Sequence, residues 1–184
     1  MPAGYWGPLI NAQVDGSALT ASTTATSLLN AQAKYTFGAG ELKIIGQTYK
    51  VRAFGRISTV VTTPGTLTLD LRLGSVIVAN GGAMALSTTA KTNVTWAMEW
   101  ELVLRAVGGG TTAQFMHVGN FLSEAAGATT VAGEAKAISL PQSAPAVGTG
   151  FDSTAAAVFD LFGTWSISNA NSIQVHGFSL TSTN

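Results

Sequence analysis

Three stretches of the sequence alternate apolar and polar residues with a period of two. The clearest covers residues 94–105, where every second residue is large and apolar and most residues between them are polar or charged: Val94, Trp96, Met98, Trp100, Leu102 and Leu104 against Thr95, Ala97, Glu99, Glu101 and Arg105. Successive side chains of a β-strand point to opposite faces of its sheet, whereas a helix repeats every 3.6 residues. The pattern therefore predicts a strand with one buried face.

The other two alternating stretches are residues 49–58 and 66–73. Tyr49, Val51 and Ile57 occupy odd positions of the first, and leucines occupy every second position of the second. The pair Pro64-Gly65 stands between the two stretches and is typical of a turn. We expect the two strands to form a hairpin.

Weaker strand patterns occur at residues 25–29, 33–37, 75–79, 114–122, 157–162, 164–167 and 172–180. We expect turns at Gly81-Gly82 and Gly108–Gly110, and loops at residues 123–137 and 137–154. A chain of about eight to ten short strands with no helix between them is typical of an all-β, antiparallel β-sandwich. We predict one jelly-roll-like sandwich domain over residues 25–184.

Residues 1–24 differ in composition from the rest of the chain. The first ten residues hold two Pro and two Gly and carry no charged side chain. Such a tract buries too little apolar area to order itself, so we predict an extended N-terminal arm. Tyr5, Trp6, Leu9 and Ile10 are its expected docking residues, either on the chain's own sandwich or on a neighbouring subunit.

The composition limits the classes of function. Nine basic and nine acidic residues cancel, only 10% of residues are charged, and there is no Cys. The lack of Cys excludes disulfides, thiolate metal sites and thiol nucleophiles. The basic residues form no stripe, so direct binding of nucleic acid is not expected. No apolar run is long enough to cross a membrane and no signal peptide is evident, so we predict a soluble protein without a membrane partner. A surface this poor in charge favours assembly with other protein.

The sequence offers few residues for catalysis. His117 and His176 lie far apart, and a cupin-like metal site would need both to meet Glu99 or Glu101. This metalloenzyme hypothesis stays open but is not favoured. The two glutamates could also serve as paired carboxylates in glycoside hydrolysis, but cross-strand ion pairs explain them without catalysis and are favoured. No nucleophile elbow of the form Gly-x-Ser-x-Gly occurs. We predict a protein that is not an enzyme and has no cofactor or metal.

Two groups of residues are candidates for contacts with partners. The first is a polar intersubunit face formed by charged residues on the polar sides of the predicted strands: Arg52, Arg56, Asp70, Arg72, Glu99 and Glu101. The second is a glycan site, because indole rings can stack on sugars. Trp96 and Trp100 share an apolar strand face and are expected in the core, which leaves Trp6 and Trp165. We expect Trp165 or the loop at residues 137–154 to stack on a glycan, if one is bound.

Residues 55–74, with the sequence GRISTVVTTPGTLTLDLRLG, are followed by Val76-Ile77-Val78 and by the Trp-rich stretch at 93–104. Over roughly residues 35 to 122 the chain resembles small virion proteins of tailed bacteriophages, which carry a similar strand, Pro-containing turn and Leu-alternating strand. The resemblance implies a jelly-roll capsid decoration or fibre protein, commonly trimeric.

From this resemblance we expect a decoration or cement protein that forms a homotrimer. Its other partner would be the major capsid protein or another virion protein, and its location the virion surface, with the capsid exterior favoured over the tail. The alternative is a glycan-binding tail or fibre domain that recognises the host surface.

Overall fold

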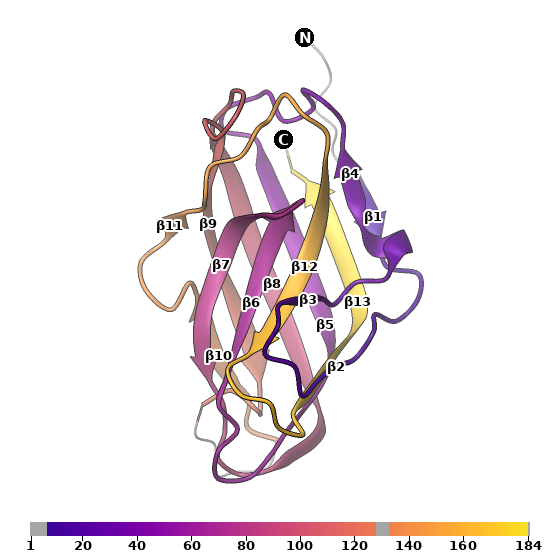
Figure 1. The fold of residues 1–184 in the computed structure, drawn as a ribbon, viewed down its shortest axis with the longest axis vertical. Helices are drawn as coiled ribbons and strands as arrows, with labels where there is room; N and C mark the ends of the chain where they lie inside the picture. The colour runs from indigo at the N-terminus through magenta and orange to yellow at the C-terminus, as the bar shows by residue number, and fades with distance from the viewer. Residues whose placement is uncertain (1–6, 128–132, 184) are drawn as a thin grey trace.

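The structure, a computed structural model, describes residues 7–127 and 133–183 (Figure 1). These residues form two antiparallel sheets of strands β1–β13 and one turn of 3-10 helix, η1 (Ala31–Ala33). The predicted all-β, antiparallel β-sandwich is confirmed. The strand count exceeds the expected eight to ten partly because β2, β3 and β11 have only two residues each. Within the described residues, no helix is long and apolar enough to span a membrane.

The larger sheet has eight strands. Its main path runs in the order β1 (Gly7–Asn11), β13 (Ser172–Ser182), β5 (Thr48–Thr59), β8 (Lys91–Ala106), β9 (Gln114–Ser123) and β10 (Lys136–Leu140). Two short strands lie off this path, β2 (Leu19–Thr20) beside β13 and β11 (Ala146–Val147) beside β9.

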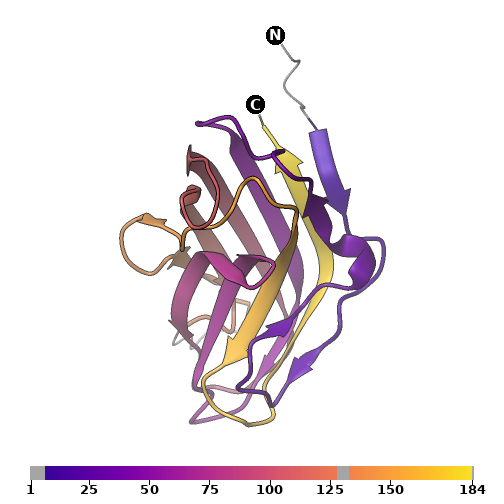
Figure 2. The same cartoon turned by 45° about the horizontal axis from the view of Figure 1, so that its top comes forward.

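The smaller sheet has five strands and packs on the inner face of the larger one (Figure 2). Its path is β3 (Thr26–Ser27), β12 (Ala157–Trp165), β6 (Thr66–Leu73) and β7 (Val76–Ala85), and β4 (Tyr35–Phe37) pairs with another part of β12.

The core lies between the two sheets and takes one set of alternate side chains from each strand. Phe37 of β4 meets Tyr49 of β5 and Phe159 of β12 edge to face, at 5.4 and 6.0 Å between ring centroids. Trp96 of β8 stacks on Phe121 of β9 at 5.8 Å. Aromatic pairs at these separations stabilise a core beyond the area that they bury. The contact of Phe37 with Tyr49 joins the two sheets, because β4 belongs to the smaller sheet and β5 to the larger one.

The predicted hairpin between residues 49–58 and 66–73 is wrong. Both edges of β5 are occupied, by β13 and β8, and β6 lies in the other sheet between β12 and β7. The chain crosses between sheets over residues 60–65, where the Asn171 side chain accepts a hydrogen bond from Val60 N at 2.9 Å and donates one to the Pro64 carbonyl. Alternation predicts which face of a strand is buried, but it does not predict which strand pairs with it.

Two smaller expectations about glycines are also wrong. Gly81 and Gly82 form no turn, because β7 continues through them with a shift in register against β6. Gly82 has φ of 78°, and its N–H donates to Asn80 Oδ1 at 2.8 Å, which is the geometry of a β-bulge. The two strands expected at 157–162 and 164–167 are the single strand β12, with Gly163 inside it.

The described part of the predicted arm lies against the larger sheet. Leu9 and Ile10 are half-buried in β1, which pairs with β13, and Gly16 N donates to the Val175 carbonyl at 2.9 Å. Leu19 is buried in the core. Tyr5 and Trp6, the other two predicted docking residues, lie outside the described residues.

Candidate interaction face

The larger sheet has one face against the core and one face toward solvent. We call the solvent side of β13, β5, β8, β9 and β10 the outer face. Cross-strand register arranges its side chains in rows. The apolar row consists of Gly177, Phe54, Ala97, Leu122 and Ala137. The charged row beside it consists of Ser179, Arg52, Glu99, Asn120 and Ser139.

The apolar row exposes large side chains at the centre of the sheet. Phe54 is 55% exposed and Leu122 is 42% exposed, and Ala97 stands between them in register. Single exposed apolar residues are common on soluble proteins, but neighbouring ones rimmed by polar groups mark contact sites. An apolar centre with a polar rim is the usual anatomy of a protein–protein interface.

In the central rows of the outer face the charges are sorted by strand. β5 carries Lys50, Arg52 and Arg56, and β8 carries Glu99 and Glu101, with the cation Arg105 farther along the same face of β8. Arg52 Nε lies 2.9 Å from Glu99 Oε1, with the two side chains 72% and 58% exposed. Because both side chains are exposed, the pair adds little to folding stability. For the same reason both charges are accessible to a partner.

Two hollows open on the outer face and share Arg52. The first, of about 480 Å³, is bordered by Lys50, Glu99, Glu101 and Val118. The second, of about 370 Å³, lies between the end of β1 and β5, where Phe54, Gly177 and Ser179 line it. The outer face therefore has two depressions, and Arg52 borders both of them.

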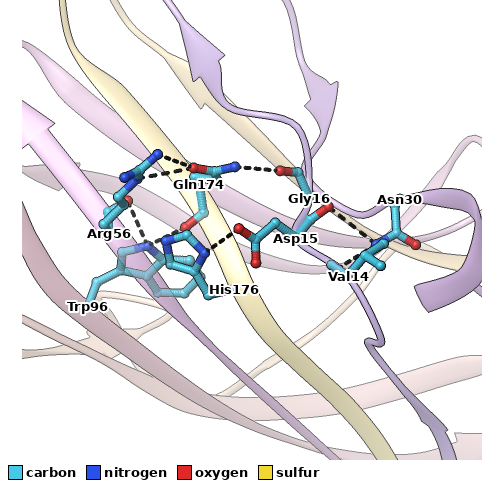
Figure 3. Close-up of polar contacts among 8 residues, drawn as sticks. All are labelled: Val14, Asp15, Gly16, Asn30, Arg56, Trp96, Gln174 and His176. Atoms are coloured by element: carbon cyan, nitrogen blue, oxygen red, sulfur yellow. Dashed lines mark hydrogen bonds and ion pairs between the residues drawn. The ribbon is translucent and has the colours of Figure 1, made fainter.

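One side of the outer face is held in place by polar contacts (Figure 3). Gln174 of β13 accepts two hydrogen bonds from the Arg56 guanidinium, at 2.8 and 3.1 Å, and donates to the Gly16 carbonyl at 3.0 Å. His176 Nδ1 lies 3.0 Å from Asp15 Oδ2. These contacts fasten the segment after β1 to β13 and fix the position of Arg56.

The predicted polar intersubunit face is divided between the two sheets. Arg52, Arg56, Glu99 and Glu101 share the outer face, as expected, but Asp70 and Arg72 belong to β6 of the smaller sheet. The six residues therefore form no common surface, because the hairpin that would have joined β5 to β6 does not exist.

Asp70 and Arg72 form a local cluster of their own. Asp70 is buried and accepts hydrogen bonds from the Arg72 guanidinium, which lies 4.1 Å from the centroid of the Phe162 ring. A guanidinium over an aromatic face is favourable when partly desolvated. The pair serves the packing of the smaller sheet.

The Trp165 side chain is placed in the core. It is 1% exposed, and its indole N–H donates to the Leu19 carbonyl at 3.3 Å. Stacking on a sugar requires an accessible ring face, so the glycan role predicted for Trp165 is wrong. Trp96 and Trp100 are buried, as expected.

The candidate metal residues do not converge. His117 is buried on the inner face of β9 beside Trp100, and burial lowers its pKa. Glu99 and Glu101 point to the opposite side of the same sheet, and His176 lies on β13 beside Asp15. In the ranges 7–127 and 133–183, no three residues of the types His, Asp and Glu are grouped so as to hold a metal ion.

Phe54 and Leu122 are candidate interaction residues that the sequence analysis does not predict. Phe54 stands at an even position of β5, among Lys50, Arg52 and Arg56, where alternation predicts a polar residue. A large aromatic at a solvent-side position was the available signal. Leu122 repeats the same anomaly on β9, where it follows the exposed Asn120 by two positions.

Comparisons with known proteins assign no family. No protein-family model matches the sequence, and no curated protein matches it. Among solved structures, it is weakly similar to the CBM2 module of the evolved Dit of Lactobacillus casei BL23 phage J-1, with a TM-score of 0.29 and 11% identity. The match covers 80% of this chain and 66% of that one, so this chain spans just under two thirds of its length. A TM-score this low does not establish a shared topology, and it transfers neither ligand nor function.

Proposed function

We propose that this chain is a non-enzymatic structural protein of a bacteriophage virion, mounted on the capsid exterior as a decoration or cement protein. The observation that carries its mode of action is the apolar row of Phe54, Ala97 and Leu122 on the outer face, with charges beside it. The phage assignment rests on the resemblance of roughly residues 35 to 122 to small virion proteins of tailed bacteriophages.

The proposed mechanism is burial of the outer face against other protein. Removing apolar surface from water stabilises a contact by about 25 cal/mol per Å² before the cost of ordering. The paired charges of Arg52 and Glu99 add orientation more than strength, because they are exposed in the single chain. A particle presents many copies at once, so contacts that are weak singly become strong together.

Attachment to the particle is proposed for Tyr5 and Trp6, with the major capsid protein or another virion protein as the receiving surface. Leu9 and Ile10, the other two docking residues expected from the sequence, belong to β1 and pack on the chain's own sheet. The resemblance implies a homotrimer as the attached unit.

The glycan-binding alternative gains no support from the described residues. The aromatic residue named for it, Trp165, is enclosed in the core, and the predicted loop at 137–154 contributes β10 and β11 to the larger sheet.

Imaging of whole particles with and without the protein tests the proposal. We expect density to disappear from the outside of the shell when the protein is absent and to return when purified chain is added back. Loss of density from the tail alone, or from no part of the particle, would overturn the capsid assignment.

A second arm of the experiment examines attachment. Purified chain that carries Tyr5→Ala and Trp6→Ala should not cosediment with particles that lack the protein, whereas Val158→Ser, an exposed position on β12 of the other sheet, should cosediment normally. Full binding by the double variant would show that the arm is not the attachment site.

A further inference from the structure

We infer that the occupant of the outer face is a second copy of this chain, docked face to face about a two-fold axis that runs along the strands between β5 and β8. The inference rests on one part of the proposed function, namely that the outer face is a contact with protein, and it names the partner. Its evidence is that the outer face is complementary to itself in charge and in shape.

The symmetry follows from the strand register. A two-fold axis that runs along the strands between β5 and β8 places β5 of one copy opposite β8 of the other. The rotation does not change the position of a residue along the strand direction. Residues that are cross-strand neighbours in one chain then face each other across the interface. Arg52, the register partner of Glu99, comes opposite Glu99 of the second copy, and Lys50 likewise comes opposite Glu101.

Charge selects this axis over the other face-to-face arrangement. The outward charges of β5 are all cations, and those of β8 in the same rows are the carboxylates of Glu99 and Glu101. An axis perpendicular to the strands would set β5 against β5 and β8 against β8, with like charges opposed. The axis along the strands instead gives a ring of four alternating charges, from Arg52 and Glu99 of both copies. Opposed like charges across an interface cost several kcal/mol, whereas complementary ones favour encounter and register.

The shapes of the apolar row fit the same arrangement. The Phe54 ring lies over Gly177, because a Cβ atom added at Gly177 would stand 2.2 Å from Phe54 Cε1. The ring therefore leans toward β13, away from β8. The same rotation brings β9 of the second copy opposite β13, so that Leu122 of the second copy faces the Phe54 ring. The hollow of about 370 Å³ beside Phe54 and Ser179 lies where this leucine enters.

The size of the contact predicts a weak pair. Five strands about 4.8 Å apart span about 24 Å, and the stretch from Lys50 to Arg56 spans about 20 Å along the strand. A footprint of roughly 500 Å² per copy falls below the roughly 800 Å² per partner of a standard interface. Pairing should therefore depend on protein concentration and weaken with salt, because screening acts on the ring of charges. A self-complementary face joins two copies only, so the proposed homotrimer would need two further contact patches elsewhere on the chain.

Sedimentation equilibrium of mixed variants tests the inference. Arg52→Glu leaves one copy with two carboxylates in the charged row, and Glu99→Arg leaves another copy with two guanidinium groups there. Each variant alone should be monomeric at concentrations where the unmodified chain pairs, with at least a tenfold weaker association. Mixed in equal amounts, the two variants should pair with each other, because the rotation sets the acidic row of one against the basic row of the other.

Controls separate this geometry from general effects of charge or folding. Glu134→Arg, an exposed position in the connection between β9 and β10, should leave pairing unchanged. Recovery on mixing shows that both variants are folded. Single variants that still pair with themselves, a mixture that stays monomeric, or an unmodified chain that stays monomeric or forms only trimers would each overturn the two-fold pair.

The two proposals can fail separately. A chain that binds shell but never pairs contradicts the two-fold contact and leaves the decoration function standing. A chain that pairs as described but is absent from the capsid contradicts the decoration function and leaves the two-fold contact standing.

Discussion

The Phe54 ring occupies the space above Gly177, where a side chain would begin 2.2 Å from its Cε1 atom. Gly177 follows the register shift in β13 and pairs directly with Phe54. The exposed ring thus owes its position to the absence of a neighbouring side chain. This relationship makes Gly177 a residue of the outer face, although it carries no side chain of its own.

Gly177→Ala should displace the Phe54 ring with little cost to folding. The obstructing atoms belong to the far end of an exposed side chain that can rotate, so we expect a change in the free energy of unfolding within about 1 kcal/mol. Pairing of copies should weaken at least several-fold, because the ring leaves its place opposite Leu122 of the second copy. Chemical denaturation and sedimentation equilibrium measure the two effects.

Gly55→Ala is the matched control on the neighbouring strand. A Cβ atom at Gly55 would stand 1.9 Å from the Gln174 carbonyl oxygen, which is backbone and cannot rotate away. We expect destabilisation of about 1–3 kcal/mol or more, as for other overpacked positions. Equal effects of the two substitutions on stability would contradict the contrast drawn between a movable ring and a fixed carbonyl.

The pair of Asp70 and Arg72 predicts a double-substitution result. Arg72→Met removes the guanidinium from a buried carboxylate and should cost about 3–5 kcal/mol, since an unpaired buried charge is strongly unfavourable. The double variant Arg72→Met with Asp70→Leu removes both charges and should recover most of that loss. Urea denaturation at neutral pH gives the values.

The control for this cycle is Asp70→Leu alone, which leaves the cation partly exposed beside Phe162 and should cost less than Arg72→Met. A double variant as unstable as the sum of the two single ones would show that the residues act independently.

Alternation in the sequence predicted the buried faces of β5, β6 and β8 correctly but not their neighbours. The buried positions of these strands are the apolar members of each alternating set, such as Tyr49, Leu67 and Trp100. Strand pairing depends on which strand edges are free to form hydrogen bonds, and alternation does not contain this information. The connection at residues 60–65 crosses between the two sheets, and its Pro64-Gly65 pair is the same as that of a hairpin turn. The predicted common face of Arg52 and Asp70 failed for that reason.

Trp165 lies in a stretch where two strands, 157–162 and 164–167, are expected from the sequence and the structure has the single strand β12. If β12 is taken as continuous, Phe159, Leu161 and Trp165 share one parity and predict a buried indole. Ending a strand at Gly163 breaks this parity. In the structure Gly163 lies inside β12 and not in a turn. A Cβ atom there would approach side-chain atoms of Leu19 and Leu28 at 3.1 and 3.2 Å. Close packing, which a single sequence does not display, explains this glycine.

Substitution of Trp165 should therefore affect stability. Trp165→Ala should lower the free energy of unfolding by about 3–5 kcal/mol, as for other large aromatic residues removed from cores. Trp165→Phe should cost less, because it keeps most of the apolar volume and loses the hydrogen bond to the Leu19 carbonyl. Thermal and chemical denaturation measure both, and a folded, fully stable Trp165→Ala variant would contradict the core assignment.

Burial of His117 predicts a loss of stability in acid. Its side chain lies against Trp100 in the core, and desolvation lowers its pKa below that of the unfolded chain, which is about 6.5. As the pH falls below that value, the unfolded state binds a proton that the native state does not, so the free energy of unfolding decreases. His117→Phe removes the titrating group and should flatten this part of the profile from pH 7 to 5. Phe115→Leu, a nearby core substitution that does not titrate, should lower stability by a similar amount at every pH in this interval. An unchanged slope in His117→Phe would show that other groups cause the acid sensitivity.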